Sequence, residues 1–318
     1  MLYFKQMRRK GKRNSFLPYV FMGIVPLLLA GFIFILYETG KNENAVPFTV
    51  SVDTSNKEIT ELAGQEMSWF DKTAEFVYEA AIILNNSFSR FKTLATPEAQ
   101  TVNIYPGARM EEIAGTFAKK LGWDKDTEKN FIAMASSDIG EGRLSPGVYV
   151  VTPDTNEEKI QEEMKERFQE EVLARYATST KSVVSLEVAI TVASMIQREA
   201  AGKNDMRLIS GIIWNRIFKD MPLGMDATLQ YAKGSEDSGW WPKLTSKDKF
   251  IDSPYNTYKN KGLPPTPISS PSLSAVAAAL NPKKTKCLFY IHDQNRQIHC
   301  STTYEEHKRN IENYYAVR

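Results

Sequence analysis

A glutamate near the end of a predicted helix is the strongest candidate for chemistry in this 318-residue chain. Within residues 186–200 (LEVAITVASMIQREA), Val188, Val192, Met195 and Glu199 recur at i, i+4, i+7 and i+11. This spacing places them on one face of a helix, so Glu199 continues an apolar stripe. The opposite face is expected to hold the polar side chains Glu187, Thr191, Ser194 and Arg198.

The predicted position of Glu199 suits a proton donor that works near neutral pH. Ser185 is a suitable N-cap residue for the helix and Gly202 a suitable residue after its end, so Glu199 falls in the last turn. Unpaired carbonyls at a helix C-terminus disfavour an ionised carboxylate, and partial burial does the same. Both effects raise the pKa of Glu199, as a general acid requires. The competing interpretation is an ordinary helical glutamate that extends into solvent.

Polar side chains downstream of this helix are candidates for binding a ligand. Asn215 lies on a predicted helix over residues 205–218, and Asp226 lies in the loop MPLGMDATLQYA. Two Pro-rich loops follow, SPYNTY and GLPPTPISSP, which are expected to be rigid and exposed. Side chains of this kind stack on sugar faces and hydrogen-bond hydroxyls, so they suit a polyhydroxylated ligand. The alternative is that the loops only connect elements. The candidates in the first loop are Ser253, Tyr255, Asn256, Thr257 and Tyr258.

The elements upstream of Glu199 predict a small βααβ unit over residues 101–152. Its ends alternate like strands, and residues 110–121 and 125–136 show helical spacing between them. A charged amphipathic helix within residues 153–182 is expected to connect this unit to the last segment, 183–318. The expected fold class is α+β.

Residues 16–37 predict a single transmembrane helix, because 22 consecutive positions carry no charge and about 20 apolar residues cross a bilayer. Six cations lie among residues 1–13, so the basic tail 1–15 should stay in the cytoplasm and residues 38–318 should lie outside. A cleavable signal peptide is disfavoured by the length of the apolar run. Residues 38–100 are expected to form a juxtamembrane linker followed by a helical segment at about residues 61–92.

The external part has no basic stripe for nucleic-acid binding, which excludes that class of partner. Subtracting the six N-terminal cations from the formal net charge of +2 leaves −4 for residues 14–318. Cys287 and Cys300 could face each other across a hairpin that turns near Asp293–Gln294, or could be buried free thiols. The three histidines do not show metal-ligand spacing, and no metal or cofactor is expected.

Several motifs in order resemble the endolytic murein transglycosylases, the YceG-like family. They are SMIQREA, WNRIFKDMPLGMDATLQYA, SPYNTY followed by GLPP, and a closing STTYEEH, and the resemblance covers about residues 183–318. The βααβ unit is similar to the LysM-like subdomain of that family, and the N-terminal anchor also fits it. The resemblance implies an enzyme at the cell membrane that acts on peptidoglycan glycan strands, and it leaves room for cell-wall synthesis enzymes as partners.

The resemblance also implies roles for the residues singled out above. Glu199 takes the position of the catalytic glutamate, and the positions of Asn215, Asp226 and SPYNTY line a glycan-binding cleft. Four positions depart from the family pattern: Gln197, Gly224, Thr266 and Ile298. A histidine is expected at the last of these, and His299 lies one place away, so it should not inherit that role.

The implied reaction is that of a lyase with one carboxyl group as acid and then base. Protonated Glu199 would donate to the oxygen between MurNAc and GlcNAc, and its carboxylate would then take the proton of the muramyl C6 hydroxyl to close a 1,6-anhydro ring. Two rival functions remain open. One is a non-catalytic wall-binding or division scaffold, which the four departures motivate; the other is a glycoside hydrolase with Asp226 as a second carboxylate.

Overall fold

The computed structural model describes residues 48–60, 98–179 and 183–315, and all of them belong to one contact unit. The predicted transmembrane segment 16–37 and the predicted helical segment before residue 93 lie outside these ranges. Within the described ranges, no helix combines the length and the apolar character needed to cross a bilayer.

The βααβ order predicted for residues 101–152 is confirmed. Strand β3 (Gln100–Ile104) pairs antiparallel with β4 (Gly147–Val151), and helices α3 (Met110–Leu121) and α4 (Lys125–Asp138) lie between them in sequence. Gly122 ends α3 with a φ of +70°, which favours glycine. The first hydrophobic core of the molecule lies here and includes Ile113, Phe117, Phe131, Leu144 and Tyr149, all buried.

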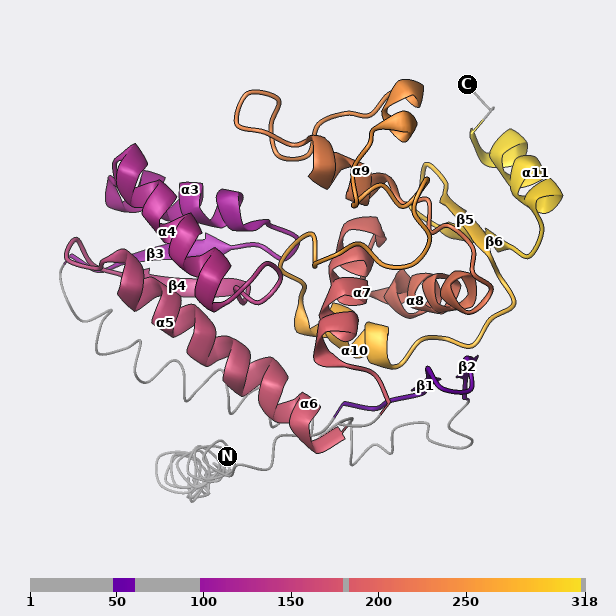
Figure 1. Cartoon of the computed structure of the whole chain (residues 1–318), viewed down its shortest axis with the longest axis horizontal. Helices are drawn as coiled ribbons and strands as arrows, with labels where there is room; N and C mark the ends of the chain where they lie inside the picture. The colour runs from indigo at the N-terminus through magenta and orange to yellow at the C-terminus, as the bar shows by residue number, and fades with distance from the viewer. Residues whose placement is uncertain (1–47, 61–97, 180–182, 316–318) are drawn as a thin grey trace, which may run out of the picture. The chain divides into compact units, whose positions relative to one another are not determined.

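The connecting helix packs more closely than a solvated connector would. It runs as α5 (Glu157–Phe168), a π-helical turn (Gln169–Leu173) and α6 (Ala174–Ser179), and Figure 1 labels its first and last parts. Ile160 and Met164 contribute to the first core. Further along, the buried side chains Phe168, Val172 and Tyr176 belong to a second core. One face of the connector therefore joins two cores, while its charged face remains in solvent.

The second core surrounds the helix that carries Glu199. This helix, α7 (Leu186–Glu199), packs against α8 (Lys203–Phe218) and α10 (Leu273–Leu280), as Figure 1 shows. The polar face predicted for α7 is wrong at two positions, since Thr191 and Ser194 are only 3% and 0% exposed. Ser194 Oγ accepts the backbone amide of Ile268 at 3.0 Å, so a Pro-rich loop covers this face.

The ends of α7 match the prediction on one side only. Ser185 caps the start, where its side chain accepts the amide of Val188. At the other end Ala200 follows the helix, and Gly202 instead precedes α8. The carboxylate of Asp205 accepts the amides of Ala201 and Gly202 and so begins α8 two residues earlier than predicted.

The linker prediction is wrong for residues 48–60. They form a short hairpin of β1 (Val52–Asp53) and β2 (Glu58–Ile59). Phe48, Val52 and Ile59 are buried in the second core, and the amide of Ser51 donates to the carbonyl of Leu280.

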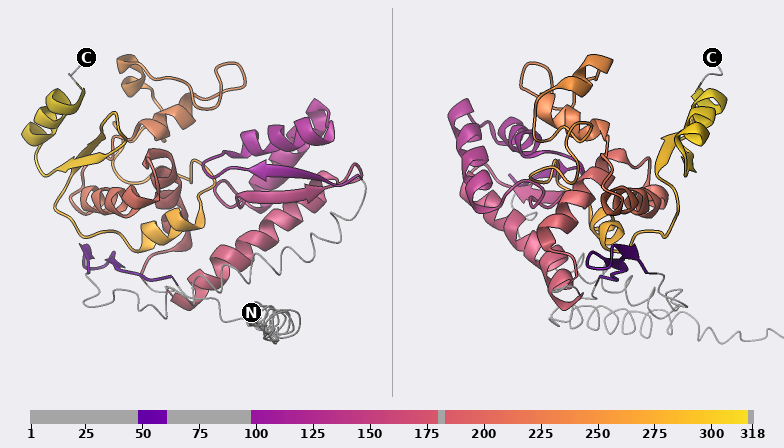
Figure 2. Two further views of the ribbon diagram at one scale, coloured as in Figure 1. Left: turned by 180° about the vertical axis from the view of Figure 1, so that it is seen from behind. Right: turned by 45° about the vertical axis from the view of Figure 1, so that its right-hand side comes forward.

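The predicted C-terminal hairpin is confirmed. Strand β5 (Phe289–His292) pairs antiparallel with β6 (Ile298–Ser301), and the chain turns between Asp293 and Gln297. Cys287 and Cys300 form a disulfide with 5.8 Å between their Cα atoms. The last described helix, α11 (Tyr304–Tyr315), packs on both strands (Figure 2).

Candidate active site

Glu199 is the last residue of α7, and although the residue as a whole is half-buried, its carboxyl group is buried and is held from two directions. The hydroxyl of Tyr290 on β5 donates to Glu199 Oε2 at 2.7 Å. The backbone amide of Ala227, in the first turn of α9 (Asp226–Lys233), also hydrogen-bonds the carboxylate. A helix N-terminus and a strand side chain therefore fix the orientation of this group.

Burial raises the pKa of Glu199, and this is the dominant influence on it. The hydrogen bonds from Tyr290 and Ala227 act in the opposite direction because they stabilise the ionised form. Repulsion by Asp226 adds to the rise, and attraction by His292 reduces it. The direction is the one predicted from the sequence and favours a proton donor.

A cavity of about 320 Å³ opens beside Glu199. Two carboxylates, an arginine, two histidines and two tyrosines line it, so its wall is rich in groups that exchange protons or hydrogen-bond hydroxyls. The lining residues are Glu199, Arg216, Leu223, Gly224, Met225, Asp226, Tyr258, Tyr290, Ile291, His292 and His307.

Two of the predicted binding residues lie at this cavity. The hydroxyl of Tyr258 donates to Asp226 Oδ1 at 2.6 Å, which joins the SPYNTY loop to the start of α9. Burial and then the neighbouring Asp226 raise the pKa of Tyr258, so its phenol stays protonated. Asp226 and Tyr258 therefore present one acceptor and one hydroxyl to a ligand beside Glu199.

Three other predicted binding residues are engaged elsewhere. Asn215 Nδ2 donates to the carbonyls of Thr285 and Cys287 at 2.8 and 3.1 Å, and so secures the segment before β5. The Tyr255 hydroxyl is 2.7 Å from Thr266 Oγ1. Ser253 Oγ accepts the amide of Tyr255. These side chains do not line the cavity of Glu199.

Asn256 and Thr257 are buried, with 0% and 1% exposure, and they shape the SPYNTY loop from within. Asn256 Nδ2 donates to the carbonyls of Lys249 and Ile251. Thr257 Oγ1 accepts the amide of Met225 at 3.0 Å. Both residues hold Tyr258 and the start of α9 in place and do not offer side chains to a ligand at the surface.

Several residues that line the cavity were not predicted from the sequence, and among them are Tyr290, His292 and His307. Tyr290 and His292 alternate along β5, and this period of two places them on one face of the strand. His307 lies in the motif STTYEEH, on α11, and its Nδ1 is buried. Only its position in space brings it to Glu199, because α11 packs on the hairpin.

Three of the four departures from the family pattern do not line the cavity of Glu199, and the fourth, Gly224, does. Gln197 Oε1 accepts the amide of Ser272, a role that a glutamate oxygen would also fill. Gly224 has a φ of +57° and a Cβ there would stand 3.4 Å from the Tyr258 ring. Ile298 pairs with His292 across the hairpin, and Thr266 bonds Tyr255. All four leave Glu199 and Tyr290 in contact.

The βααβ unit contacts α7 directly next to the acid. The amide of Gly107 donates to the carbonyl of Ser270, and the amide of Ser270 donates to the carbonyl of Ala108, each at 2.8 Å. Arg198, the neighbour of Glu199, donates to the carbonyl of Gly107. Its guanidinium carbon lies 3.7 Å from the centroid of the Trp241 ring. The unit therefore braces the end of the helix that positions the carboxyl group.

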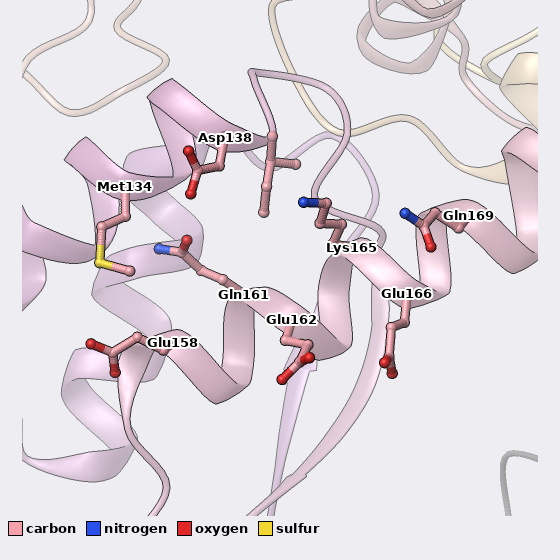
Figure 3. A pocket seen from close by; sticks show the side chains of 9 residues that line it. Met134, Asp138, Glu158, Gln161, Glu162, Lys165, Glu166 and Gln169 are labelled. Carbon is pink, nitrogen blue, oxygen red and sulfur yellow. The ribbon is translucent and has the colours of Figure 1, made fainter.

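A larger cavity, about 470 Å³, lies between α4 and α5 (Figure 3). Asp138 and Gln161 face each other across it, while the carboxylates of Glu162 and Glu166 point away from it. The Gln161 amide is already occupied by the carbonyl of Phe131 at 2.8 Å. This cavity gathers no set of converging groups, so the cavity of Glu199 is the better candidate active site.

Comparisons with known proteins agree on one family. The model of the YceG-like family matches residues 71–313. The endolytic murein transglycosylase of Bacillus subtilis strain 168 is 32% identical over 247 residues, which cover 70% of this chain and 68% of that protein. The protein of the same name from Streptococcus pneumoniae strain D39 is 32% identical over 173 residues, covering 54% of this chain and only 31% of that protein. A crystal structure of a yceG-like protein from Listeria monocytogenes matches with a TM-score of 0.58 and 30% identity, over 66% of this chain and 75% of that one.

Proposed function

Because the chain belongs to the YceG-like family, we propose that it is an endolytic lytic transglycosylase that cuts the glycan strands of peptidoglycan. The names of the curated relatives support this substrate and reaction class. The observation that carries the proposal is the carboxyl group of Glu199, whose pKa burial raises and which Tyr290 holds at 2.7 Å beside an open cavity. One buried acid of this kind is what the reaction requires.

Glu199 acts as the acid of the proposed reaction. Its proton passes to the oxygen that links MurNAc C1 to GlcNAc, and the bond from C1 to that oxygen breaks as positive charge develops on the muramyl ring. The muramyl C6 oxygen then bonds to C1, loses its proton to a base and closes a 1,6-anhydro ring. Water is not consumed. Asp226 and Tyr258 are placed to hydrogen-bond sugar hydroxyls at the same cavity.

A glycoside hydrolase is the second candidate, and a specific observation favours it. Asp226 lines the same cavity as Glu199, so it could serve as a second carboxylate that activates water. The non-catalytic scaffold has less support, because the four departures leave the contact of Glu199 with Tyr290 intact.

Two matched variants, Glu199→Gln and Asp226→Asn, test the proposal. Both exchanges keep size and hydrogen bonding and remove the carboxyl chemistry. We expect Glu199→Gln to bind glycan strands about as well as the unaltered chain but to release at least about 10²-fold fewer fragments per unit time. Its melting temperature should not fall, because a carboxylate in a partly apolar site does not favour folding.

Asp226→Asn should retain most of the cutting rate and weaken binding instead. If Glu199→Gln cuts at nearly the unaltered rate and Asp226→Asn does not, the acid is misassigned. If the unaltered chain cuts nothing, the scaffold is the better function.

We also propose that residues 16–37 anchor the enzyme in the cell membrane with residues 38–318 outside. The uncharged run and the six preceding cations support this topology. The disulfide between Cys287 and Cys300 is in keeping with an oxidising compartment. A protease added to intact wall-stripped cells should remove the external part, and complete protection of that part would contradict the topology.

A further inference from the structure

We propose that His292 is a second catalytic residue of this site, an imidazole held by Asp205 that takes the proton of the attacking muramyl C6 hydroxyl. The inference rests on the proposed transglycosylase function and deepens it. It divides between two side chains the acid and base roles that one glutamate would otherwise perform in turn.

The contact between His292 and Asp205 fixes which ring nitrogen is free. His292 Nε2 lies 2.7 Å from Asp205 Oδ2. Asp205 is only 8% exposed, and its two oxygens also accept the backbone amides of Ala201 and Gly202 at 3.0 Å. A carboxylate that already accepts two amides is an acceptor for the imidazole as well, so Nε2 carries the proton. Nδ1 of the neutral ring is then left with its lone pair and can accept a proton.

The imidazole is at the right place in the fold. It lines the cavity of Glu199, and its ring meets the ring of Tyr290 edge-on with 5.9 Å between centroids. Tyr290 in turn donates to Glu199. Three neighbouring groups on one wall of the cavity are thus an acid, the phenol that orients it and an imidazole held by a buried carboxylate.

The proton balance of the step closes without a further reactant. Glu199 gives its proton to the departing GlcNAc oxygen as the bond from that oxygen to C1 breaks. O6 bonds to C1, and the C6 hydroxyl proton passes to His292. The products are a carboxylate and an imidazolium in one cavity, and opposite charges this close attract each other. Transfer of the proton from His292 to Glu199 through solvent restores both groups.

Titratable or charged side chains surround His292 on each element that packs around the cavity. They are Asp205 and Arg216 on α8, Glu199 on α7, Asp226 on α9, His307 on α11, Tyr258 in the SPYNTY loop and Tyr290 on β5.

The same hairpin provides a matched control. His299 on β6 also binds an aspartate through Nε2, at 2.9 Å from Asp293 Oδ2. Its ring stacks on Tyr314 with 3.7 Å between centroids, and it does not line the cavity. Two pairs of the same chemical type therefore differ in whether they face Glu199.

The test compares His292→Gln with His299→Gln in the purified chain acting on uncrosslinked glycan strands. We expect His292→Gln to lower the rate of anhydro-end release at least about tenfold, near the lower end of what one proton transfer contributes, because Glu199 can still act as base. His299→Gln should stay within about twofold. Melting temperatures of both variants establish that they are folded.

Chemical rescue separates a catalytic from a structural role, because free imidazole can accept the proton in the space that the missing side chain leaves. His292→Ala is therefore assayed with added imidazole, which should restore activity. This variant also serves if His292→Gln is poorly folded.

Three results would overturn the inference. They are an unaltered rate for His292→Gln, equal losses for His292→Gln and His299→Gln, and no restoration of His292→Ala by imidazole. In each case the proposed function stands as long as Glu199→Gln fails to cut. If Glu199→Gln cuts normally, Glu199 is not the acid and the site proposed for the reaction fails with it.

Discussion

Among the residues that the structure describes, burial raises the pKa of two carboxyl groups, Glu199 and Glu141, and only Glu199 lines the candidate cavity. Glu199 ends α7 beside the cavity and meets Tyr290 and Ala227. Glu141 lies in the loop between α4 and β4, where burial raises its pKa to about 7. It accepts the amides of Met110 and Gly142 at 3.2 Å and lies 3.5 Å from the Tyr231 hydroxyl.

The comparison shows that a raised pKa by itself indicates only that a carboxyl group is buried. Whether that group can transfer a proton to a ligand depends on whether it faces a cavity. Glu141 joins the βααβ unit to α9, and Arg109 beside it donates to the carbonyl of Tyr231. Both carboxyl oxygens of Glu141 accept hydrogen bonds from backbone amides. Glu199 keeps a face toward an open cavity, so the same direction of shift serves proton transfer there.

The largest expected effect comes from making the same Glu→Gln exchange at both positions. Glu199→Gln should lower the cutting rate at least about 10²-fold, whereas Glu141→Gln should change it less than about twofold. Both rates are measured with the purified chain on the same glycan strands. Equal losses of cutting rate in the two variants would contradict the account, because they would show that a position beside the cavity does not give Glu199 a special role.

An intermediate effect is expected from Tyr290→Phe. The variant removes the donor that holds Glu199 Oε2, and a hydrogen bond to a charged group contributes about 1.5–3 kcal/mol, so cutting should fall by a factor of about 10 to 100. That bond also lowers the pKa of Glu199, so its loss should raise this pKa and move the alkaline limb of the pH profile to higher pH.

Tyr105→Phe, at a side chain that is 69% exposed, is the control and should leave rate and limb unchanged. A limb that moves to lower pH in Tyr290→Phe would contradict the assigned hydrogen bond.

Glu141→Gln has the smallest expected effect on activity, but it should have a measurable effect on the pH dependence of stability. The pKa of Glu141 in the folded chain, about 7, lies above its ordinary value of 4.5. The folded state therefore binds the extra proton, and its stabilisation is complete below about pH 4.5 and is lost as the pH rises through 7. The free energy of unfolding should fall by about 3 kcal/mol across this range.

Glu141→Gln should remove most of this slope, measured by urea unfolding at several pH values. A slope that is unchanged in the variant would assign it to other groups.

The sequence was sufficient where local pattern and packing agree. Period-two and helical spacing predict β3, α3, α4 and β4 because each buries one face in its own core. Glu199 could be singled out for the same reason, since it continues the apolar stripe of α7.

The remaining features depend on contacts between distant segments. Ser194 is buried because the loop at Ile268 covers it. Asn256 is a plausible sugar ligand by type, but the loop folds over its side chain. His292 and His307 are 15 residues apart in sequence, and only the packing of α11 on the hairpin brings both to one cavity. The residue pattern within one segment cannot predict such contacts between distant segments.

The most direct test of the proposed reaction is to cut glycan strands in water enriched in ¹⁸O and to determine the new ends by mass spectrometry. A transglycosylase that depends on Glu199 should produce 1,6-anhydro muramyl ends, each lighter by one water than a reducing end and free of ¹⁸O, and Glu199→Gln should produce almost none. Reducing ends that carry ¹⁸O would contradict the proposed reaction and would indicate a hydrolase in which Asp226 activates water.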